Sequence, residues 1–423
     1  MSTTDLLKPI LTGGIRSVNF FNGRLLSGED MSREQEANRD AHKMLGQAIG
    51  DGIAYGLEVS RALGAGTSAV VNVQPGMAVN RNGDTLRLSG AVDLSLVRPQ
   101  NGGGTVVDAG FSSCTPFQSG VYVAGSGVYL LTVCPARATE GRAAVSGLQN
   151  SAADCNTKYQ VDGVQFRLIQ LDVTTGELND QNHLRNLVAY KCFGVADDNS
   201  FVTDPFGSSS QRYGMLDDLR PDRLTDCDVP LAVLFWTAGG GIKFIDLWSV
   251  RRRITPPSIV DRWNLFIGDR RVSEAEARFL QFADQIQDIR LNETNLELII
   301  ATDRFTQLPP VGVLPVGARS SRGFDYRRFF QNETYHEPVF VEDAQVQSLI
   351  FESFRYPPIE LGSRELIWLY NVRTNRQTID NAGRSALQAY LVFATGHLPY
   401  RGNARFDVNR WNYSNYSQRS AQL

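Results

Sequence analysis

VNFFNGRLLSGEDMSREQEANRDAHKMLGQAIGDGIAYGLEV, residues 18–59, is the stretch around which the rest of the chain is organised. Asn22-Gly23 lies in its apolar first part and favours a tight turn, because both residues tolerate positive φ. Ser27, with Asp30 three positions later, has the spacing of a capping box. These residues predict a helix over about residues 28–47.

The predicted helix is polar apart from one narrow stripe along its length. A helix of this kind can bury little apolar surface against its own chain. One interpretation is a solvated helix that lies on a domain. The other is a helix that packs against copies of itself, because small alanine side chains allow a close approach. Periodicity does not decide between them. The stripe consists of Ala37, Ala41, Met44 and Ala48, with Leu45 beside it.

The segment before the helix carries two adjacent aromatic residues, Phe20 and Phe21. In an extended chain, neighbouring side chains point to opposite sides, so at least one of the two rings needs a partner. We therefore expect the segment and the helix to form an intermolecular contact. The predicted docking and oligomerisation residues are Phe20, Phe21, Asn22, Leu25, Leu26, Ala37, Ala41, Met44 and Ala48.

The same stretch resembles the amino-terminal part of baseplate, fibre and fibre-anchoring proteins of phage tails and tail-like contractile injection particles. The shared pattern is an FxNGxxL-S/T-xxD/E segment, a polar helix, a GLEV step and a strand pair around V-x-PG-x-A. It is firmest over residues 18–88. The resemblance implies a structural role, other tail or baseplate proteins as partners, and a homo-oligomer, most commonly a trimer. The residues that carry it are Phe21, Asn22, Gly23, Leu25, Leu26, Ser27, Asp30, 56–59 and 73–78.

Composition and charge exclude several other classes of protein. The chain has 423 residues, 42% hydrophobic and 21% charged, which predicts about two to four domains of ordinary globular composition. The net charge of −3 argues against a nucleic-acid partner bound by neutralising its phosphates. We find no apolar run of about 18 residues that predicts a transmembrane helix, and no signal-peptide pattern at the start. We expect synthesis in the cytoplasm and then assembly into a virion or tail-like particle.

The cysteines and histidines give no sign of a metal site. The odd number of cysteines and the lack of C-x-x-C argue against a disulfide framework and a zinc site, so we expect buried free thiols. No histidine has a metal-ligand spacing to another. The sequence therefore predicts no metal and no cofactor. The residues are Cys114, Cys134, Cys155, Cys192 and Cys227, with His42, His183, His336 and His397.

Common catalytic motifs are also absent from the sequence, including G-x-S-x-G, G-x-x-x-x-G-K-[ST] and H-E-x-x-H. Adjacent carboxylates such as Asp217-Asp218 are typical of a solvated surface. Arg251-Arg252-Arg253 follows a predicted strand, where a solvated basic strand end is commoner than a phosphate site. We therefore expect no catalytic residue and no enzymatic activity.

The rest of the chain alternates β-rich segments with a few helices, which predicts a β-rich α+β, multidomain protein. An N-terminal helix comes first and several antiparallel β domains follow. The predicted units are an arm over 1–17, a docking helix with a small β domain over 18–99, a β-rich domain over 120–254, an α+β domain over 258–400 and a polar arm over 401–423.

Some local expectations bear on how these units are built. Residues 138–159 predict a long polar insertion, and the proline-rich residues 308–315 predict an extended connector or a rigid turn. Ser273-Glu274-Ala275-Glu276 predicts the start of an amphipathic helix, either a core helix or an inter-subunit one. The sequence also predicts loops at 100–120 and 197–226, a boundary at Pro256-Pro257, and helices at 180–190 and 342–354.

Three functional hypotheses follow. The first is a structural component of a phage tail or tail-like contractile particle, at the baseplate or at a fibre attachment. The second is a carbohydrate-degrading tail protein, which needs a cleft with two placed carboxylates. The third is a glycan-binding module that uses the aromatic and polar C-terminal part.

Overall fold

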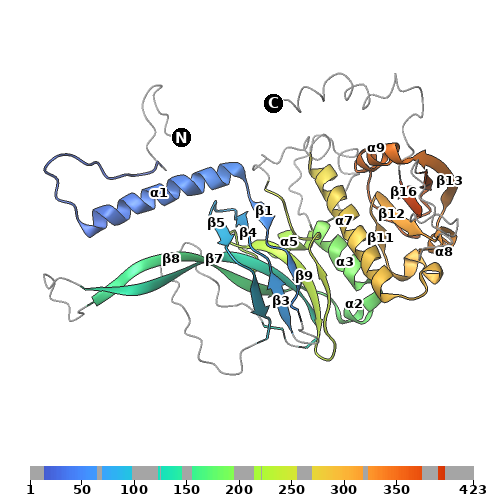
Figure 1. The fold of residues 1–423 in the computed structure, drawn as a ribbon, viewed down its shortest axis with the longest axis horizontal. Helices are drawn as coiled ribbons and strands as arrows, with labels where there is room; N and C mark the ends of the chain where they lie inside the picture. The colour runs from blue at the N-terminus through green and yellow to red at the C-terminus, as the bar shows by residue number, and fades with distance from the viewer. Residues whose placement is uncertain are drawn as a thin grey trace, which may run out of the picture.

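The computed structural model describes residues 14–63, 69–97, 122–123, 125–144, 155–194, 214–220, 222–254, 269–317, 323–373 and 389–395. They form a β-rich α+β protein with several separate sheets, as the sequence predicts (Figure 1). Several sequence-based expectations lie outside the described residues. These are residues 1–13 of the arm predicted over 1–17, the arm over 401–423, the loop over 100–120, most of the loop over 197–226 and the boundary at Pro256-Pro257.

The first helix, α1 (Gly28–Ile49), begins at its predicted position. The Ser27 hydroxyl accepts a hydrogen bond from the backbone N–H of Asp30, and the Asp30 carboxylate accepts one from the backbone N–H of Ser27. This pair occupies N–H groups that the start of a helix leaves unpaired. The predicted capping box is therefore confirmed.

The strands that follow α1 form two small antiparallel sheets with the orders β1-β4-β5 and β2-β3-β6. Their turns come where the sequence has Pro75-Gly76 and Asn82-Gly83. The first sheet consists of β1 (Gly52–Gly56), β4 (Gly76–Val79) and β5 (Thr85–Leu88). The second consists of β2 (Val59–Arg61), β3 (Val70–Val73) and β6 (Val92–Ser95).

A larger antiparallel sheet, in the order β10-β9-β7-β8, forms the centre of the molecule. It is built from β7 (Gly127–Ala144), β8 (Cys155–Gln170), β9 (Val229–Thr237) and β10 (Gly241–Asp246). β9 pairs with residues 127–133 of β7, so β7 and β8 continue beyond β9 as a two-stranded hairpin that projects from the body (Figure 1).

The polar insertion predicted over residues 138–159 is wrong, because these residues include the outer parts of β7 and β8. The two strands satisfy each other's backbone groups along the hairpin. Neither face of the outer hairpin needs to be buried for that, so the alternation of apolar and polar residues that indicates a strand is confined to a short stretch over residues 158–162.

The two faces of the central sheet are covered by different parts of the chain. On one face, Leu131 and Leu234 share a core with Val71 and Leu86 of the N-terminal strands. On the other face, Leu130 packs with Leu184 of a helix. The helices after β8 are α2 (Thr175–Asn179), α3 (Gln181–Phe193) and α5 (Gly214–Asp218).

A long helix, α7 (Asp269–Asn292), lies between the central sheet and the C-terminal part (Figure 1). The start predicted at Ser273 is wrong, since the helix begins one turn earlier. A serine followed by an acidic residue is compatible with a helix interior, so the pattern alone does not fix the first residue. Phe282 and Ile286 are 1% and 3% exposed, which confirms the interpretation of a core helix.

The C-terminal part is organised around a four-stranded sheet in the order β12-β16-β15-β13, in which β13 and β15 are parallel. Its strands are β12 (Val311–Val316), β13 (Tyr335–Glu342), β15 (Ile367–Arg373) and β16 (Ala389–Ala394). The remaining elements are the 3-10 helices η1 (Leu296–Leu298) and η2 (Ala301–Asp303), the helices α8 (Tyr326–Phe329) and α9 (Asp343–Ser353), and the paired strands β11 (Gln307–Leu308) and β14 (Ile359–Glu360).

The connector predicted over residues 308–315 is also wrong, because most of it belongs to β12. This strand lies at the edge of its sheet and pairs along its length with β16, Pro315 opposite Tyr390. On its other side, an isolated bridge joins Val316 to Phe324. An edge strand has one side without a partner strand, so a proline that lacks an N–H is tolerated there.

Candidate functional site

The segment before α1 runs back beside the first half of the helix (Figure 1). The backbone N–H of Val18 donates to the Glu34 carboxylate at 3.1 Å, and Arg24 forms an ion pair with Asp30 at 2.7 Å. Gly23 has a φ of +89° in the turn that precedes Arg24, as the Asn-Gly pair predicts. The segment is therefore held to α1 by polar contacts.

The capping carboxylate at the start of α1 is stabilised in its ionised form. The backbone N–H of Ser27, then its hydroxyl, and the charge of Arg24 lower the pKa of Asp30 below its usual value. The cap and the ion pair that hold the segment therefore persist at neutral pH.

Large apolar side chains of the segment and of α1 remain exposed. Phe20 is 51% exposed, Phe21 63% and Leu25 94%. Exposed apolar groups gathered on one part of a protein are typical of an interaction site. We call the exposed apolar side chains of the segment before α1 the N-terminal apolar surface; it consists of Phe20, Phe21, Leu25 and Leu26.

The predicted docking residues fall into two groups. Phe20, Phe21, Asn22, Leu25 and Leu26 lie together in the exposed segment, and Ala41, Met44 and Ala48 lie along α1. Within the helical stripe, Ala37 is only 7% exposed and Ala41 is half-buried, whereas Met44 and Ala48 are exposed. The docking role of these residues stays a prediction.

The last turns of α1 are anchored to the body by a contact between two glycines. A Cβ atom at Gly46 would lie 2.2 Å from the carbonyl oxygen of Gly83, and a Cβ atom at Gly83 would lie 2.0 Å from the carbonyl oxygen of Lys43. Gly83 also has a φ of +81°, which favours glycine. Lys43 forms an ion pair with Asp84 at 3.1 Å, and the Gln47 side chain donates to the Asn82 carbonyl at 3.3 Å. We call these contacts the α1 anchor.

This anchor determines which side of α1 faces away from the body. Successive residues of an α-helix are about 100° apart. Met44 and Ala48 are each two positions from Gly46 and therefore lie about 160° away from it around the helix axis. The exposed half of the predicted stripe points away from the body.

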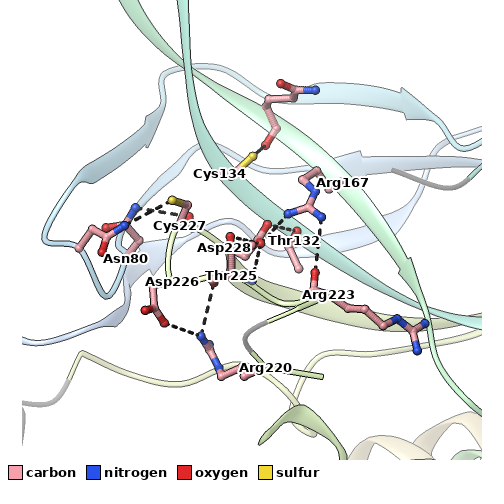
Figure 2. Close-up of polar contacts among 12 residues, drawn as sticks. Asn80, Thr132, Cys134, Arg167, Arg220, Arg223, Thr225, Asp226, Cys227 and Asp228 are labelled. Carbon is pink, nitrogen blue, oxygen red and sulfur yellow. Dashed lines mark hydrogen bonds and ion pairs between the residues drawn. The ribbon is translucent and has the colours of Figure 1, made fainter. Parts of the chain in front are cut away.

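The turn that receives α1 is fixed in its own right. The Asn80 side chain is 1% exposed, and its amide donates to the Asp84 carboxylate at 3.1 Å and to the Cys227 carbonyl at 3.4 Å. The Arg81 backbone N–H donates to the Asp226 carbonyl at 3.1 Å. Figure 2 shows Asn80 beside the loop that carries Asp226, Cys227 and Asp228.

That loop is held in turn by a buried ion pair on the central sheet (Figure 2). The Asp228 carboxylate accepts hydrogen bonds from Arg167 at 2.6 Å, from the Thr132 hydroxyl at 3.0 Å and from the Thr225 hydroxyl at 2.6 Å. Asp228 is 2% exposed and Arg167 6%. A chain of polar contacts thus leads from the sheet to α1 and sets its direction.

The basic triplet has a different place from the one predicted. Arg251 donates to the carbonyls of Gly56 at 2.6 Å and Leu57 at 2.7 Å, and the Ile53 backbone N–H donates to the Arg252 carbonyl at 2.8 Å. The expected solvated strand end is therefore wrong for Arg251, which joins the N-terminal strands to the end of the central sheet region.

The cysteines are only partly as expected. Cys134 and Cys192 are buried free thiols, and burial raises the pKa of each to about 12. Cys227 is disulfide-bonded, so the expectation of a free thiol is wrong at that position. Within the part of the chain that the structure describes, no group of three or more His, Cys, Asp or Glu residues could hold a metal ion. In the same part, no helix is long and apolar enough to cross a membrane.

Sequence reasoning missed the α1 anchor and the projecting hairpin. A glycine inside a helix costs about 1 kcal/mol relative to alanine, so Gly46 was a signal of a close contact. The sequence has no comparable signal for the partner, because Gly83 lies in a turn where glycine is expected for its φ alone.

No family model matches this chain, and no curated protein matches it. The solved structures similar to it include a crystal structure of TssK, with 7% identity and a TM-score of 0.27 over 66% of this chain and 50% of that one. They also include the TssK-TssF-TssG baseplate subcomplex of a type VI secretion system, with 12% identity and a TM-score of 0.24 over 66% of this chain and 73% of that one. The chain thus spans half the length of the first TssK structure. At these scores neither likeness carries an argument about function.

Proposed function

We propose that this protein is a structural component of a phage tail or a phage-tail-like contractile injection particle, at the baseplate or at a fibre attachment. It acts by docking and oligomerisation rather than by catalysis, and it enters the particle after synthesis in the cytoplasm. The resemblance over residues 18–88 supports the type of particle.

The single observation that carries the docking role is the N-terminal apolar surface. Leu25 and Phe21 are 94% and 63% exposed although they belong to a segment that polar contacts hold in place. Burying such side chains contributes about 25 cal/mol per Å² of apolar area, which favours a partner that covers them. The partners we propose are another tail or baseplate protein and further copies of this chain.

The homo-oligomer is proposed to be a trimer, as the resemblance implies. Light scattering on the purified full chain at micromolar concentration measures this directly. We expect three times the mass of one chain, and a monomer would contradict the oligomer.

Incorporation of full-length variants into purified particles tests the docking role. We expect Phe21→Glu combined with Leu25→Glu to abolish incorporation, because two charges would enter an apolar contact, while circular dichroism remains that of the folded chain. Leu298→Glu is the matched control, since Leu298 is 59% exposed but belongs to the C-terminal part. Normal incorporation of the double variant would contradict the proposal. A deletion of residues 1–50 should likewise remain folded and stay out of the particle.

A further inference from the structure

Helix α3 presents different faces to the two parts of the molecule that it joins. Leu184, Val188 and Cys192 follow one another at four-residue spacing, so they share one face of the helix, and they pack in the core with the central sheet. Polar side chains in the first half of the helix contact α7 or the C-terminal part instead. We call these contacts the α3 joint; they are made by Asn182, His183, Arg185 and Asn186.

Two of these side chains hold the joint without changing their own charge. Asn186 is 1% exposed, and its side-chain oxygen accepts from the backbone N–H groups of Thr306 at 2.8 Å and Gln307 at 3.1 Å. Its amide donates to the Gln307 carbonyl at 3.0 Å. Arg185 pairs with Asp288 of α7. Neither an amide nor a guanidinium changes its charge near neutral pH, so these side chains form the permanent part of the joint.

His183 makes a contact that depends on protonation. Its Nδ1 lies 2.8 Å from the carboxylate of Asp180, and its Nε2 lies 2.7 Å from the backbone carbonyl oxygen of Thr302 in η2. Both neighbours are hydrogen-bond acceptors. A neutral imidazole has one N–H group and an imidazolium has two, so only the cation donates to both. The His183 side chain is 25% exposed, so water can exchange protons with it.

The basic groups on the surrounding elements have acidic partners of their own. Arg304 pairs with Glu293 at 2.6 Å, and Arg185 pairs with Asp288. The Thr302 hydroxyl accepts from the uncharged amide of Asn332 at 3.4 Å. A change in the charge of His183 therefore acts mainly on its own two contacts. The charged groups on the elements around the ring are Asp180, Arg185, Asp288, Glu293, Asp303 and Arg304.

We propose that His183 is a pH-sensitive latch in the α3 joint, which holds the Thr302 carbonyl when the ring is cationic and releases it when the ring is neutral. The single N–H of the neutral ring stays with Asp180, because a hydrogen bond to an ionised acceptor is the stronger of the two. The Nε2 lone pair then faces the Thr302 carbonyl oxygen, and two acceptors repel each other.

The direction of the pH dependence follows from this arrangement. The closed latch binds a proton, so it is favoured as the pH falls and lost as the pH rises through the range in which histidines change charge, between about pH 5 and 8. Acidic conditions therefore tighten η2 against α3. The latch lies apart from the N-terminal apolar surface, so it does not depend on the proposed docking role.

Hydrogen exchange over η2 in the full chain tests the latch. The backbone N–H groups of Asp303, Arg304 and Phe305 donate within this turn, so they exchange when it opens. Mass spectrometry gives their protection factors, which are intrinsic rates divided by observed rates at the same pH. We expect protection to be about fivefold higher at about pH 5.5 than at about pH 8, the factor that one net hydrogen bond contributes. Equal protection at the two pH values would overturn the inference.

Two substitutions separate the latch from a contact that is merely structural. In Asp180→Asn, an amide N–H can donate to Nδ1 while Nε2–H donates to Thr302, so a neutral ring keeps both contacts and the pH dependence should disappear. Asp180 makes no capping hydrogen bond to α3, so the helix should remain intact. His183→Gln has no titratable group and should also show equal protection. A pH dependence that persists in His183→Gln would overturn the inference.

Two control variants should keep the fivefold difference. His42→Gln removes an exposed histidine of α1. Asp284→Asn removes a carboxyl group of α7 whose pKa is raised by burial, although it accepts from Trp248 at 2.5 Å. A carboxyl group with a raised pKa also favours the folded state at lower pH, so it would act in the same direction as the latch. Loss of the pH dependence in either control would overturn the role of His183.

Discussion

Helices α1 and α7 are alike as sequences and opposite as structures. They have 22 and 24 residues, and each has one apolar stripe on an otherwise charged helix. In α7 the stripe is buried, with Phe282 1% and Ile289 8% exposed. In α1, Leu45 is 61% exposed. An apolar stripe in the sequence of a helix therefore predicts that one face will be buried. Only the surrounding structure shows whether that face is buried within the same chain.

The neighbours of each helix explain the difference. α7 is surrounded: Phe282 lies 5.3 Å from Phe305 and 5.2 Å from Phe393 between ring centroids, and Arg185 of α3 contacts Asp288 of α7. α1 is fixed by its leading segment and by the anchor at its last turns. A core helix is defined by apolar contacts, and a projecting helix by polar and backbone contacts.

The largest effect should come from Phe282→Ala. Removing a ring from a packed aromatic cluster leaves a cavity, so the free energy of unfolding should fall by about 3–5 kcal/mol. Urea denaturation measures it. Leu45→Ala in α1 is the comparison and should change the free energy by less than about 0.5 kcal/mol in dissociated chains. Equal losses in both variants would break the distinction between the two helices.

Asp228→Asn should have the next largest effect. It removes the charge that Arg167 pairs with while keeping a group that can accept from Thr132 and Thr225. Removing one partner of a buried ion pair should cost about 3 kcal/mol. Asp226→Asn is the matched control, because the Asp226 side chain is 59% exposed and surface ion pairs contribute about 0–1 kcal/mol. A loss in the control as large as that in Asp228→Asn would contradict the role of the buried pair.

Gly83→Ala should weaken the attachment of α1 to the body without destabilising the core helix α7. The new Cβ would meet the Lys43 carbonyl, and a left-handed backbone costs about 1–2 kcal/mol in a residue other than glycine. We expect faster amide hydrogen exchange over residues 43–49 and unchanged exchange in α7. Gly90→Ala is the control, since a Cβ there would have open space. Unchanged exchange in α1 would show that the glycine contact does not anchor it.

The smallest effect should come from Ser27→Ala, at the free end of α1. Loss of an N-cap costs about 1 kcal/mol, and here it should appear as faster exchange in the first turn only. Loss of the hydroxyl should also raise the pKa of Asp30 toward its usual value, because that hydroxyl lowers it. An NMR titration of Asp30 measures this, with Ser32→Ala as the control. An unchanged pKa would contradict the capping arrangement.

What the sequence predicts correctly is mostly local. The cap at Ser27, the turn at Asn82-Gly83 and the alternation in β5 act within a few residues, and the structure confirms them. The wrong predictions come where long-range pairing decides. β12 is buried on both faces, so its apolar run does not alternate. Most of the outer hairpin is held by the pairing of β7 with β8 rather than by burial.

The candidate site divides in the same way. The exposure of Phe20, Phe21 and Leu25 fits a segment that the sequence predicts to dock. The direction of α1 could not be predicted, because it depends on Gly46 meeting a turn 37 positions away and on a loop near Asp228. The residues around Gly46 in the sequence do not indicate which turn it will contact.

The α1 anchor has a mechanical consequence, because α1 is a lever clamped at one end. The clamp spans Lys43 to Gln47, about 6 Å, and the free part from Gly28 to His42 extends about 22 Å beyond it at 1.5 Å per residue. A displacement of about 0.5 Å across the clamp would swing the tip by about 2 Å. Gly46 and Gly83 are in direct backbone contact, with no side chain between them, so α1 can move little at this contact. The position of the first turn of α1, far from the body, is therefore fixed by the contacts at its last turns.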